Sequence, residues 1–206
     1  ARALRWVVKV LGQNSVQKGF AMQVQECAAR ARAAALRLAT LSTTTKNQAL
    51  EALAATLEQS QETLVAANQH DVDRASRLVA AGEMSKPLLD RLKLDEHKVR
   101  DMAAGVRSVA KLPDPVGRLL TAIELDKGLE LTQVTCPLGV IGAIFESRPD
   151  AVPQIASLCW KAGNAVIMKG GTEAQESNRV LGQLIQQALA SVETWAGDAV
   201  HMVETR

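Results

Sequence analysis

One stretch in the C-terminal third of the chain combines residue types that suit anion binding. The sequence GNAVIMKGGTEAQ, residues 163–175, ends a short apolar run with Lys169, Gly170, Gly171 and Thr172. A buried strand that delivers a cation and two glycines to the start of a helix offers an ammonium group, close backbone approach and free N–H groups. An ordinary strand-to-helix turn with a lysine for solubility is the other interpretation. Neither a Walker pattern nor G-x-G-x-x-G is present, so both stay open.

A second loop, ESRPD over residues 146–150, carries an arginine at the end of another apolar run. Arg148 could hold a phosphate or a carboxylate through two parallel hydrogen bonds. It could equally pair with Glu146 or Asp150 and only fix the turn. Taken alone, this loop favours the structural role.

The three cysteines give little sign of chemistry. Cys27 and Cys159 lie in alanine- and leucine-rich stretches, where small buried thiols are common. Cys136 precedes a proline and has no histidine near it in sequence to activate it. An odd number of cysteines without metal-ligand spacing predicts free thiols in a reducing compartment and no metal site.

These loops need a sheet to position them, and the sequence after residue 117 predicts one. A hairpin is expected over residues 118–140, with its turn at Asp126-Lys127-Gly128. The run GVIGAIF is typical of a strand covered on both faces, and AVIMK and DAVHMV are expected to be further parallel strands. Helices between them complete the rhythm of a doubly wound sheet, where ligands collect at the carboxyl ends of strands. Thr172 and Gln175 have capping-box spacing, which predicts a helix from Glu173.

Residues 22–113 are expected to be helical throughout. Ser42 is a candidate N-cap, and Gly82 is a candidate C-terminal stop. The stripe of apolar residues between them has helical spacing and comprises Leu50, Leu53, Ala54, Leu57 and Leu64.

Composition excludes several classes of protein. A formal net charge of +2 and 2% aromatic residues argue against a nucleic-acid partner, and the chain has no uninterrupted apolar run long enough for a membrane helix. Residues 1–21 carry four basic residues and no acid. They are expected to be a disordered extension before Met22, and a remnant of a transit peptide is the alternative.

The blocks PLGV, FESRPD, KGGTEA and SNR, all between Cys136 and Leu181, resemble the γ-glutamyl phosphate reductases, also called glutamate-5-semialdehyde dehydrogenases. The resemblance runs from Met22 to the end and includes ANQHDVDRA and LLDRLKL in the helical part. It implies an aldehyde-dehydrogenase-like α/β fold. The expected divisions are a helical N-terminal region (22–113), a hairpin used as an oligomerisation arm (114–136) and the first part of an NADPH-binding, Rossmann-like domain (137–206).

The resemblance also implies roles for residues. Lys169 would bind the adenosine ribose or the 2′-phosphate of NADPH, with Gly170, Gly171 and Thr172 lining the same turn. Phe145 and Glu146 complete the set of cofactor-binding residues. Arg148 stands in the loop where ordinary aldehyde dehydrogenases place an asparagine of the oxyanion hole. It would bind the oxyanion or the phosphate of an acyl phosphate substrate.

The implied reaction reduces L-glutamyl 5-phosphate to L-glutamate 5-semialdehyde and phosphate in proline biosynthesis. A cysteine thiolate attacks the acyl carbon and NADPH supplies the hydride. None of the three cysteines matches the family's nucleophile motif, so the chain is expected to be an N-terminal portion that is inactive alone. A homo-oligomer, an association with glutamate 5-kinase, and a cytoplasmic or, with a transit remnant, organellar location are further expectations.

Two other functions stay open at this point. The chain could be a non-catalytic nucleotide-binding module, or a helical interaction protein whose function lies in residues 22–113. Saturable NADPH binding that depends on Lys169 would argue against the second.

Overall fold

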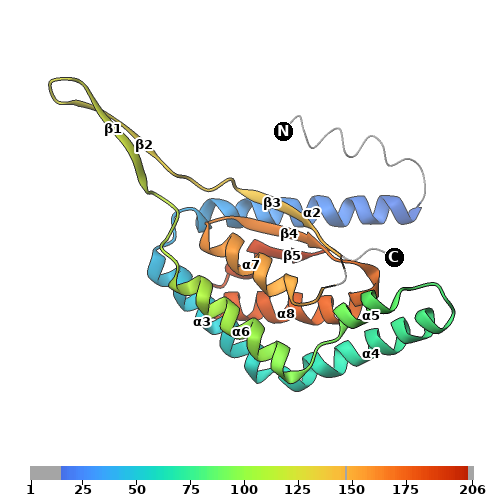
Figure 1. Ribbon diagram of the computed structural model, residues 1–206. Coiled ribbons are helices and arrows are strands. Elements are labelled where there is room, and N and C mark those ends of the chain that lie inside the picture. Colours follow the sequence, from blue (N-terminus) through green and yellow to red (C-terminus); the bar gives the residue numbers. More distant parts are fainter. Residues whose placement is uncertain (1–14, 147, 204–206) are drawn as a thin grey trace.

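The computed structural model describes residues 15–146 and 148–203, with side chains from residue 24 onward. This part of the chain forms a parallel sheet between layers of helices, with a hairpin that projects away from them (Figure 1). No helix in this part of the chain is long and apolar enough to cross a membrane.

The sheet is parallel and lies between two layers of helices. In spatial order its strands are β3 (Val140–Ile144), β4 (Ala165–Lys169) and β5 (Val200–Met202). The crossover helices α7 (Ala151–Lys161) and α8 (Gln175–Ala190) cover one face, and α2 (Ser15–Leu38) covers the other (Figure 1). A short 3-10 helix, η2 (Ala196–Ala199), leads into β5. The predicted α/β class, with a helical region ahead of a parallel sheet, is confirmed.

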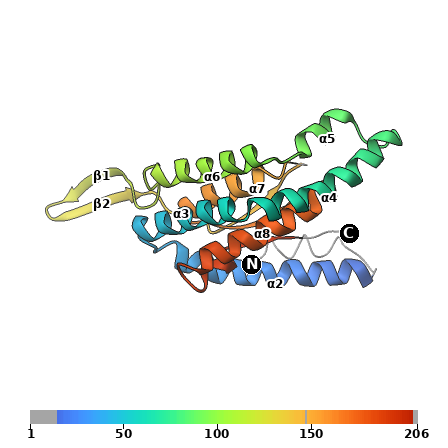
Figure 2. The same cartoon turned by 90° about the horizontal axis from the view of Figure 1, so that it is seen from below.

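The remaining helices form an outer layer against α7 and α8. They are α3 (Thr43–Gln59), α4 (Gln61–Ala80), α5 (Lys86–Leu92) and α6 (Glu96–Lys111) (Figures 1 and 2). The predicted apolar stripe is buried along its whole length, from Leu50 to Leu64. Trp160 of α7 is buried too, and its indole N–H donates to the carbonyl of Lys46 in α3 at 3.1 Å. The outer helices and the sheet therefore share one core.

Two residues that the sequence marks as helix ends, a capping serine and a glycine, lie where they were predicted. The Ser42 hydroxyl accepts from the N–H of Thr45 at 3.1 Å, and Gly82 follows α4 with φ 76°. The stripe does not lie on a single helix, however. Ser60 leaves the helical conformation at ψ 15°, so Leu64 belongs to α4. A serine inside a polar run is a weak helix former, because its hydroxyl competes for backbone hydrogen bonds.

The first described helix begins at Ser15, so residues 15–21 are helical, and the expectation of disorder is wrong for them. Gln17, Lys18 and Ala21 are good helix formers, and a lack of acidic residues does not oppose a helix. Residues 1–14 lie outside the described part of the chain, and their disorder stays a prediction.

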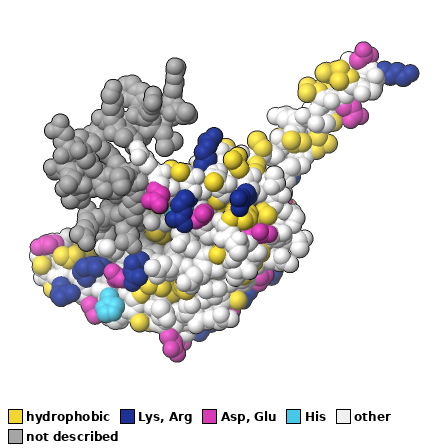
Figure 3. All heavy atoms as spheres, turned by 180° about the vertical axis from the view of Figure 1, so that it is seen from behind, with side chains coloured by type: hydrophobic (Ala, Val, Ile, Leu, Met, Phe, Trp, Pro, Cys, Tyr) yellow, Lys and Arg dark blue, Asp and Glu magenta, His cyan; other side chains and the backbone are white. Residues whose placement is uncertain are grey.

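The hairpin consists of β1 (Leu119–Asp126) and β2 (Leu129–Val134), which pair antiparallel with the turn where it was predicted. Gly128 has φ 79°, a backbone conformation that favours glycine at this turn. Every residue of both strands is exposed. Figure 3 shows hydrophobic side chains along this projection and charged side chains at its far end.

β3 departs from the expectation of a strand covered on both faces. It is one edge of the sheet that the described residues form, and Val140 and Ile144 are exposed, as is Leu138 just before the strand. An apolar run of this length indicates a strand but does not say whether it is central or at an edge.

Candidate functional site

The two loops singled out in the sequence leave neighbouring strands at the same edge of the sheet. Ile144, the last residue of β3, pairs with Lys169, the last residue of β4. The N–H of Phe145 donates to the carbonyl of Lys169 at 3.1 Å, and the N–H of Val203 after β5 donates to Met168 at 2.8 Å. The carboxyl ends of all three strands therefore meet here, where a parallel sheet binds its ligands.

The turn after β4 places a half-buried lysine beside tightly packed glycines. The Lys169 ammonium lies 3.4 Å from the carbonyl of Gly170, which is a weak contact. A Cβ at Gly170 would lie 2.3 Å from the side-chain nitrogen of Asn178 and 3.1 Å from the Phe145 ring. Packing against these two residues alone therefore accounts for a glycine at position 170. Gly171 lies under the side chain of Glu173.

The N–H groups expected to be free at the start of the following helix are in part taken up by the protein itself. The buried carboxylate of Asp71, from α4, accepts from the N–H groups of Glu176 at 3.2 Å and Ser177 at 2.8 Å, and from the Ser177 hydroxyl at 2.8 Å. An anion from the protein itself therefore caps α8. The predicted cap at Thr172 is wrong, since a 3-10 turn, η1 (Thr172–Ala174), precedes α8 and the helix begins at Gln175.

The same part of α4 also holds the turn. The Arg74 guanidinium donates to the carbonyls of Thr172 at 3.2 Å and Glu173 at 3.3 Å, and to Asp71 at 2.6 Å. Asn68, one turn earlier in α4, donates to the Ser177 hydroxyl at 3.0 Å. The helical region therefore fixes the conformation of the turn that follows β4.

A shallow groove lies at this turn. Its walls are Gly170, Gly171, Thr172, Gln175, Asn178, Arg179, Met202 and Val203. Asn178 is buried, and its side-chain oxygen has no hydrogen-bond partner among the described residues. A buried amide oxygen without a partner is costly, so the packing of Asn178 beside Gly170 carries an energetic penalty.

The loop after β3 brings Arg148 to the start of α7. Its guanidinium donates to the Asp150 carboxylate at 3.0 Å, which is one of the two structural pairings considered from the sequence. The Arg148 side chain is still 61% exposed, so the pairing leaves room for another partner. Glu146 is exposed in the same loop.

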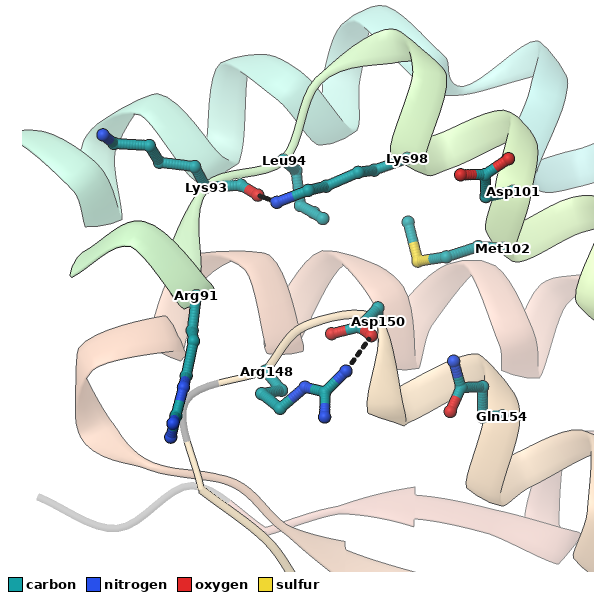
Figure 4. Close-up of a pocket in the computed structure, with 9 residues that line it drawn as sticks. All are labelled: Arg91, Lys93, Leu94, Lys98, Asp101, Met102, Arg148, Asp150 and Gln154. Atoms are coloured by element: carbon teal, nitrogen blue, oxygen red, sulfur yellow. Dashed lines mark hydrogen bonds and ion pairs between the residues drawn. The ribbon is translucent and has the colours of Figure 1, made fainter. Parts of the chain in front are cut away.

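A cavity of about 270 Å³ lies between this loop and the helical region (Figure 4). Its walls are Arg91, Lys93, Leu94, Lys98, Asp101, Met102, Arg148, Asp150 and Gln154. In Figure 4 Arg148 lies near the middle of the group, beneath the segment that joins α5 to α6. Four of the nine side chains are cations, so the cavity suits a ligand with negative charge.

Burial disfavours two of the three cysteines as nucleophiles. Burial raises the pKa of the Cys27 thiol, where the opposing effect of Arg30 is smaller, and it raises the pKa of the buried Cys159 thiol. Both groups are thus kept as thiols, which are poor nucleophiles. Cys136 is exposed. Among the described residues, no group of three or more His, Cys, Asp or Glu side chains could hold a metal ion.

Sequence reasoning missed the residues that the helical region contributes. Asp71 and Arg74 hold the turn after β4, and Arg91 and Lys98 line the cavity at Arg148. The run DRLKLDEHK, residues 90–98, is rich in charge at a helix–helix junction. This concentration of charge was the available signal for a ligand-binding role, but a charged run more often forms a solvated surface.

Comparison with known proteins first identifies the class of fold. The chain superposes on a probable aldehyde dehydrogenase of Listeria monocytogenes with a TM-score of 0.69 over 93% of this chain and 39% of the other, at 15% identity. No protein-family model matches the chain. The described residues therefore have the aldehyde dehydrogenase type of fold, as the sequence predicted.

Relatives with higher sequence identity belong to one group of proteins within that class of fold. A γ-glutamyl phosphate reductase of Methanosarcina barkeri is 48% identical over 177 residues, 86% of this chain and 40% of the relative. The crystal structure of the γ-glutamyl phosphate reductase of Thermotoga maritima is 30% identical, with a TM-score of 0.83 over 88% of this chain and 42% of the other. The chain is thus homologous to γ-glutamyl phosphate reductases, and it spans about two-fifths of their length.

Proposed function

We propose that this chain forms the cofactor-binding part of an enzyme that reduces L-glutamyl 5-phosphate to L-glutamate 5-semialdehyde and phosphate with NADPH, in proline biosynthesis. The observation that carries the proposal is the meeting of two loops at one sheet edge, where the Phe145 N–H donates to the Lys169 carbonyl at 3.1 Å. One loop carries Lys169 and the other carries Arg148. Homology to γ-glutamyl phosphate reductases supports the assignment of the substrate.

The residues at the turn after β4 fit a nucleotide. The groove is lined by the glycine backbone at Gly170 and Gly171, and the ammonium of Lys169 lies beside Gly170. Because Asp71 already neutralises the start of α8, the negative group of NADPH depends on Lys169 for its charge partner. When bound, NADPH supplies a hydride, and the chain's residues supply its position.

The loop after β3 is assigned to the substrate. Arg148 has donors left over from its pairing with Asp150, and these would stabilise the oxyanion or the leaving phosphate. Cys27 and Cys159 are kept as thiols by burial, and we assign the nucleophilic cysteine to the portion of the enzyme that these 206 residues do not include. The chain alone is then a nucleotide-binding unit without turnover.

Location and partners complete the proposal. Free cysteines support the cytoplasm as the compartment. The exposed hairpin supports a homo-oligomer. An association with glutamate 5-kinase would deliver an acyl phosphate, which is prone to hydrolysis, directly to this enzyme.

The test is a titration of the chain with NADPH, followed by the change in nicotinamide fluorescence. We expect saturable binding that Lys169→Ala weakens about tenfold, because one charge-assisted hydrogen bond is lost. NADH should bind the parent chain more weakly than NADPH and should lose less affinity in the variant if the lysine contacts the 2′-phosphate.

Lys111→Ala, an exposed lysine at the end of α6, is the matched control and should bind NADPH like the parent chain. Equal NADPH affinity for the Lys169→Ala variant and the parent would remove the basis of the cofactor assignment. An absence of saturable binding by the parent would reject the proposed function.

A further inference from the structure

The cavity at Arg148 has more positive charge than its own carboxylates balance. Asp150 pairs with Arg148, and Asp101 lies 3.0 Å from the ring nitrogen of His97. Arg91 has no carboxylate partner within the described part of the chain, and the Lys98 ammonium donates to a backbone carbonyl, that of Lys93 (Figure 4). Arg91 and Lys98 therefore line this cavity without a direct ion pair to a carboxylate of the described residues.

The floor of the cavity is apolar. Leu94 and Met102 are both buried, 8% and 3% exposed, while Arg91, Asp101 and Gln154 are exposed at the rim. An apolar floor below a cationic rim suits a short aliphatic chain that ends in an acidic group. A nucleic acid or a protein segment would need a larger surface than a cavity of about 270 Å³ provides.

We propose that this cavity binds the amino-acid end of the substrate, an inference that rests on the proposed function. Lys98 binds the α-carboxylate at the segment that joins α5 to α6, Arg91 adds positive charge at the rim, and the carbon chain lies over Leu94 and Met102. Arg148 lies on the opposite wall, at the sheet edge, and faces the activated acyl end (Figure 4). The helical region would then select a substrate with an α-carboxylate, while the sheet positions the reacting group.

The probe for this inference is L-glutamine, which keeps the α-carboxylate and carries an uncharged carbonyl at the reacting end. The backbone amide signals of Leu94, Met102 and Gln154 in the ¹⁵N-labelled chain should shift saturably as L-glutamine is added. Lys98→Gln should weaken this binding about tenfold, since a charge-assisted hydrogen bond is lost. Arg91→Gln should have a smaller effect in the same direction, and Lys111→Gln, at the far end of α6, should have none.

Two further ligands test what is recognised. The compound 4-aminobutanamide lacks only the α-carboxylate and should not produce the shifts. Inorganic phosphate should bind more weakly than L-glutamine. If phosphate matches L-glutamine, or if Lys98→Gln and Arg91→Gln bind L-glutamine like the parent, the cavity is no amino-acid site and the inference is overturned.

Failure of this inference can be told apart from failure of the proposed function. NADPH is titrated into the same samples, and its binding depends on Lys169 on a different loop. Normal NADPH binding without any L-glutamine binding overturns the inference and leaves the proposed function standing. If the chain binds neither NADPH nor L-glutamine, the proposed function and this inference are both rejected.

Discussion

At the scale of single residues, Asp71 occupies the helix N-terminus that follows β4. Its carboxylate accepts three hydrogen bonds at the start of α8 and is fully buried. A bare helix N-terminus would attract a phosphate by itself. Here a protein carboxylate holds that position, so a negative ligand at this turn would need a side-chain cation, and the proposed function assigns Lys169 to that role.

Asp71→Asn should destabilise the chain by about 2 kcal/mol. The amide has one acceptor oxygen where the carboxylate has two, and the substitution removes the charge-assisted cap of α8. Urea unfolding measures the loss. Ser177→Ala, which keeps the backbone donors but removes the hydroxyl that donates to Asp71 and accepts from Asn68, should cost about 1 kcal/mol. Equal stability of Asp71→Asn and the parent would show that the cap contributes nothing.

The sequence predicted the meeting of the Lys169 and Arg148 loops, because parallel strands bring their carboxyl ends to one edge whatever the details of packing. It did not predict Asp71, which binds Ser177 from 106 positions away. Nor did it predict Arg91 and Lys98 at the cavity. Contacts between a helix and a distant loop depend on how the layers pack, and no local pattern encodes them.

At the scale of elements, local chemistry predicted boundaries that side chains or glycines set. Ser42 caps α3 and the Asp126-Lys127-Gly128 turn closes the hairpin. The break at Ser60 was missed because no proline or glycine marks it. No local signal in the sequence marks the start of α2 at Ser15, because the change in charge after residue 21 does not coincide with a helix boundary.

One buried ion pair joins α3 to the segment that leads into the hairpin. Lys46, 1% exposed, lies 3.0 Å from Asp114. Burial would raise the pKa of Asp114, yet hydrogen bonds from the Val116 N–H, from Lys46 and from Thr43 together hold it below its usual value. A carboxyl with a lowered pKa in the folded state stabilises the fold above the pKa it has when unfolded.

Asp114→Asn should therefore cost about 3 kcal/mol at neutral pH, because Lys46 is left buried without a counter-charge. The difference from the parent should be full above about pH 4 and should shrink as pH falls through the lowered pKa. Urea unfolding between pH 7 and pH 3 measures it. Asp101→Asn, an exposed aspartate of α6, is the control and should change stability little. A cost for Asp114→Asn that stays constant down to pH 3 would contradict the assignment.

At the scale of the whole molecule, the sheet depends on the helical region. α2 covers the face of the sheet opposite α7 and α8 (Figure 1). The strand and helix rhythm of the sequence predicted the sheet, but it did not show which distant helix covers its second face. The order of strands and helices in the sequence also did not show that β3 lies at an edge of the sheet, with Ile144 exposed. Which helix covers which face of the sheet depends on how the layers pack in three dimensions, and a local sequence pattern does not encode it.

The hairpin is the part of the described molecule that most lacks a partner. Ile123 and Leu131 pair across the two strands and are 50% and 56% exposed, whereas Glu124 and Glu130 pair on the other face. An isolated two-stranded hairpin is marginally stable in water, and an exposed apolar row along it favours association. At these two pairs, one face of the hairpin is thus apolar and the other is acidic.

We therefore expect the chain to self-associate through the apolar face of the hairpin. Ile123→Lys together with Leu131→Lys should shift the chain toward the monomer in sedimentation velocity, because lysines opposed to each other disfavour burial and repel. Ala122→Lys together with Thr132→Lys adds the same charge at a pair on the acidic face, and this control should keep the association of the parent. If the parent is monomeric at every concentration, or if both double variants dissociate alike, the apolar face of the hairpin does not drive assembly.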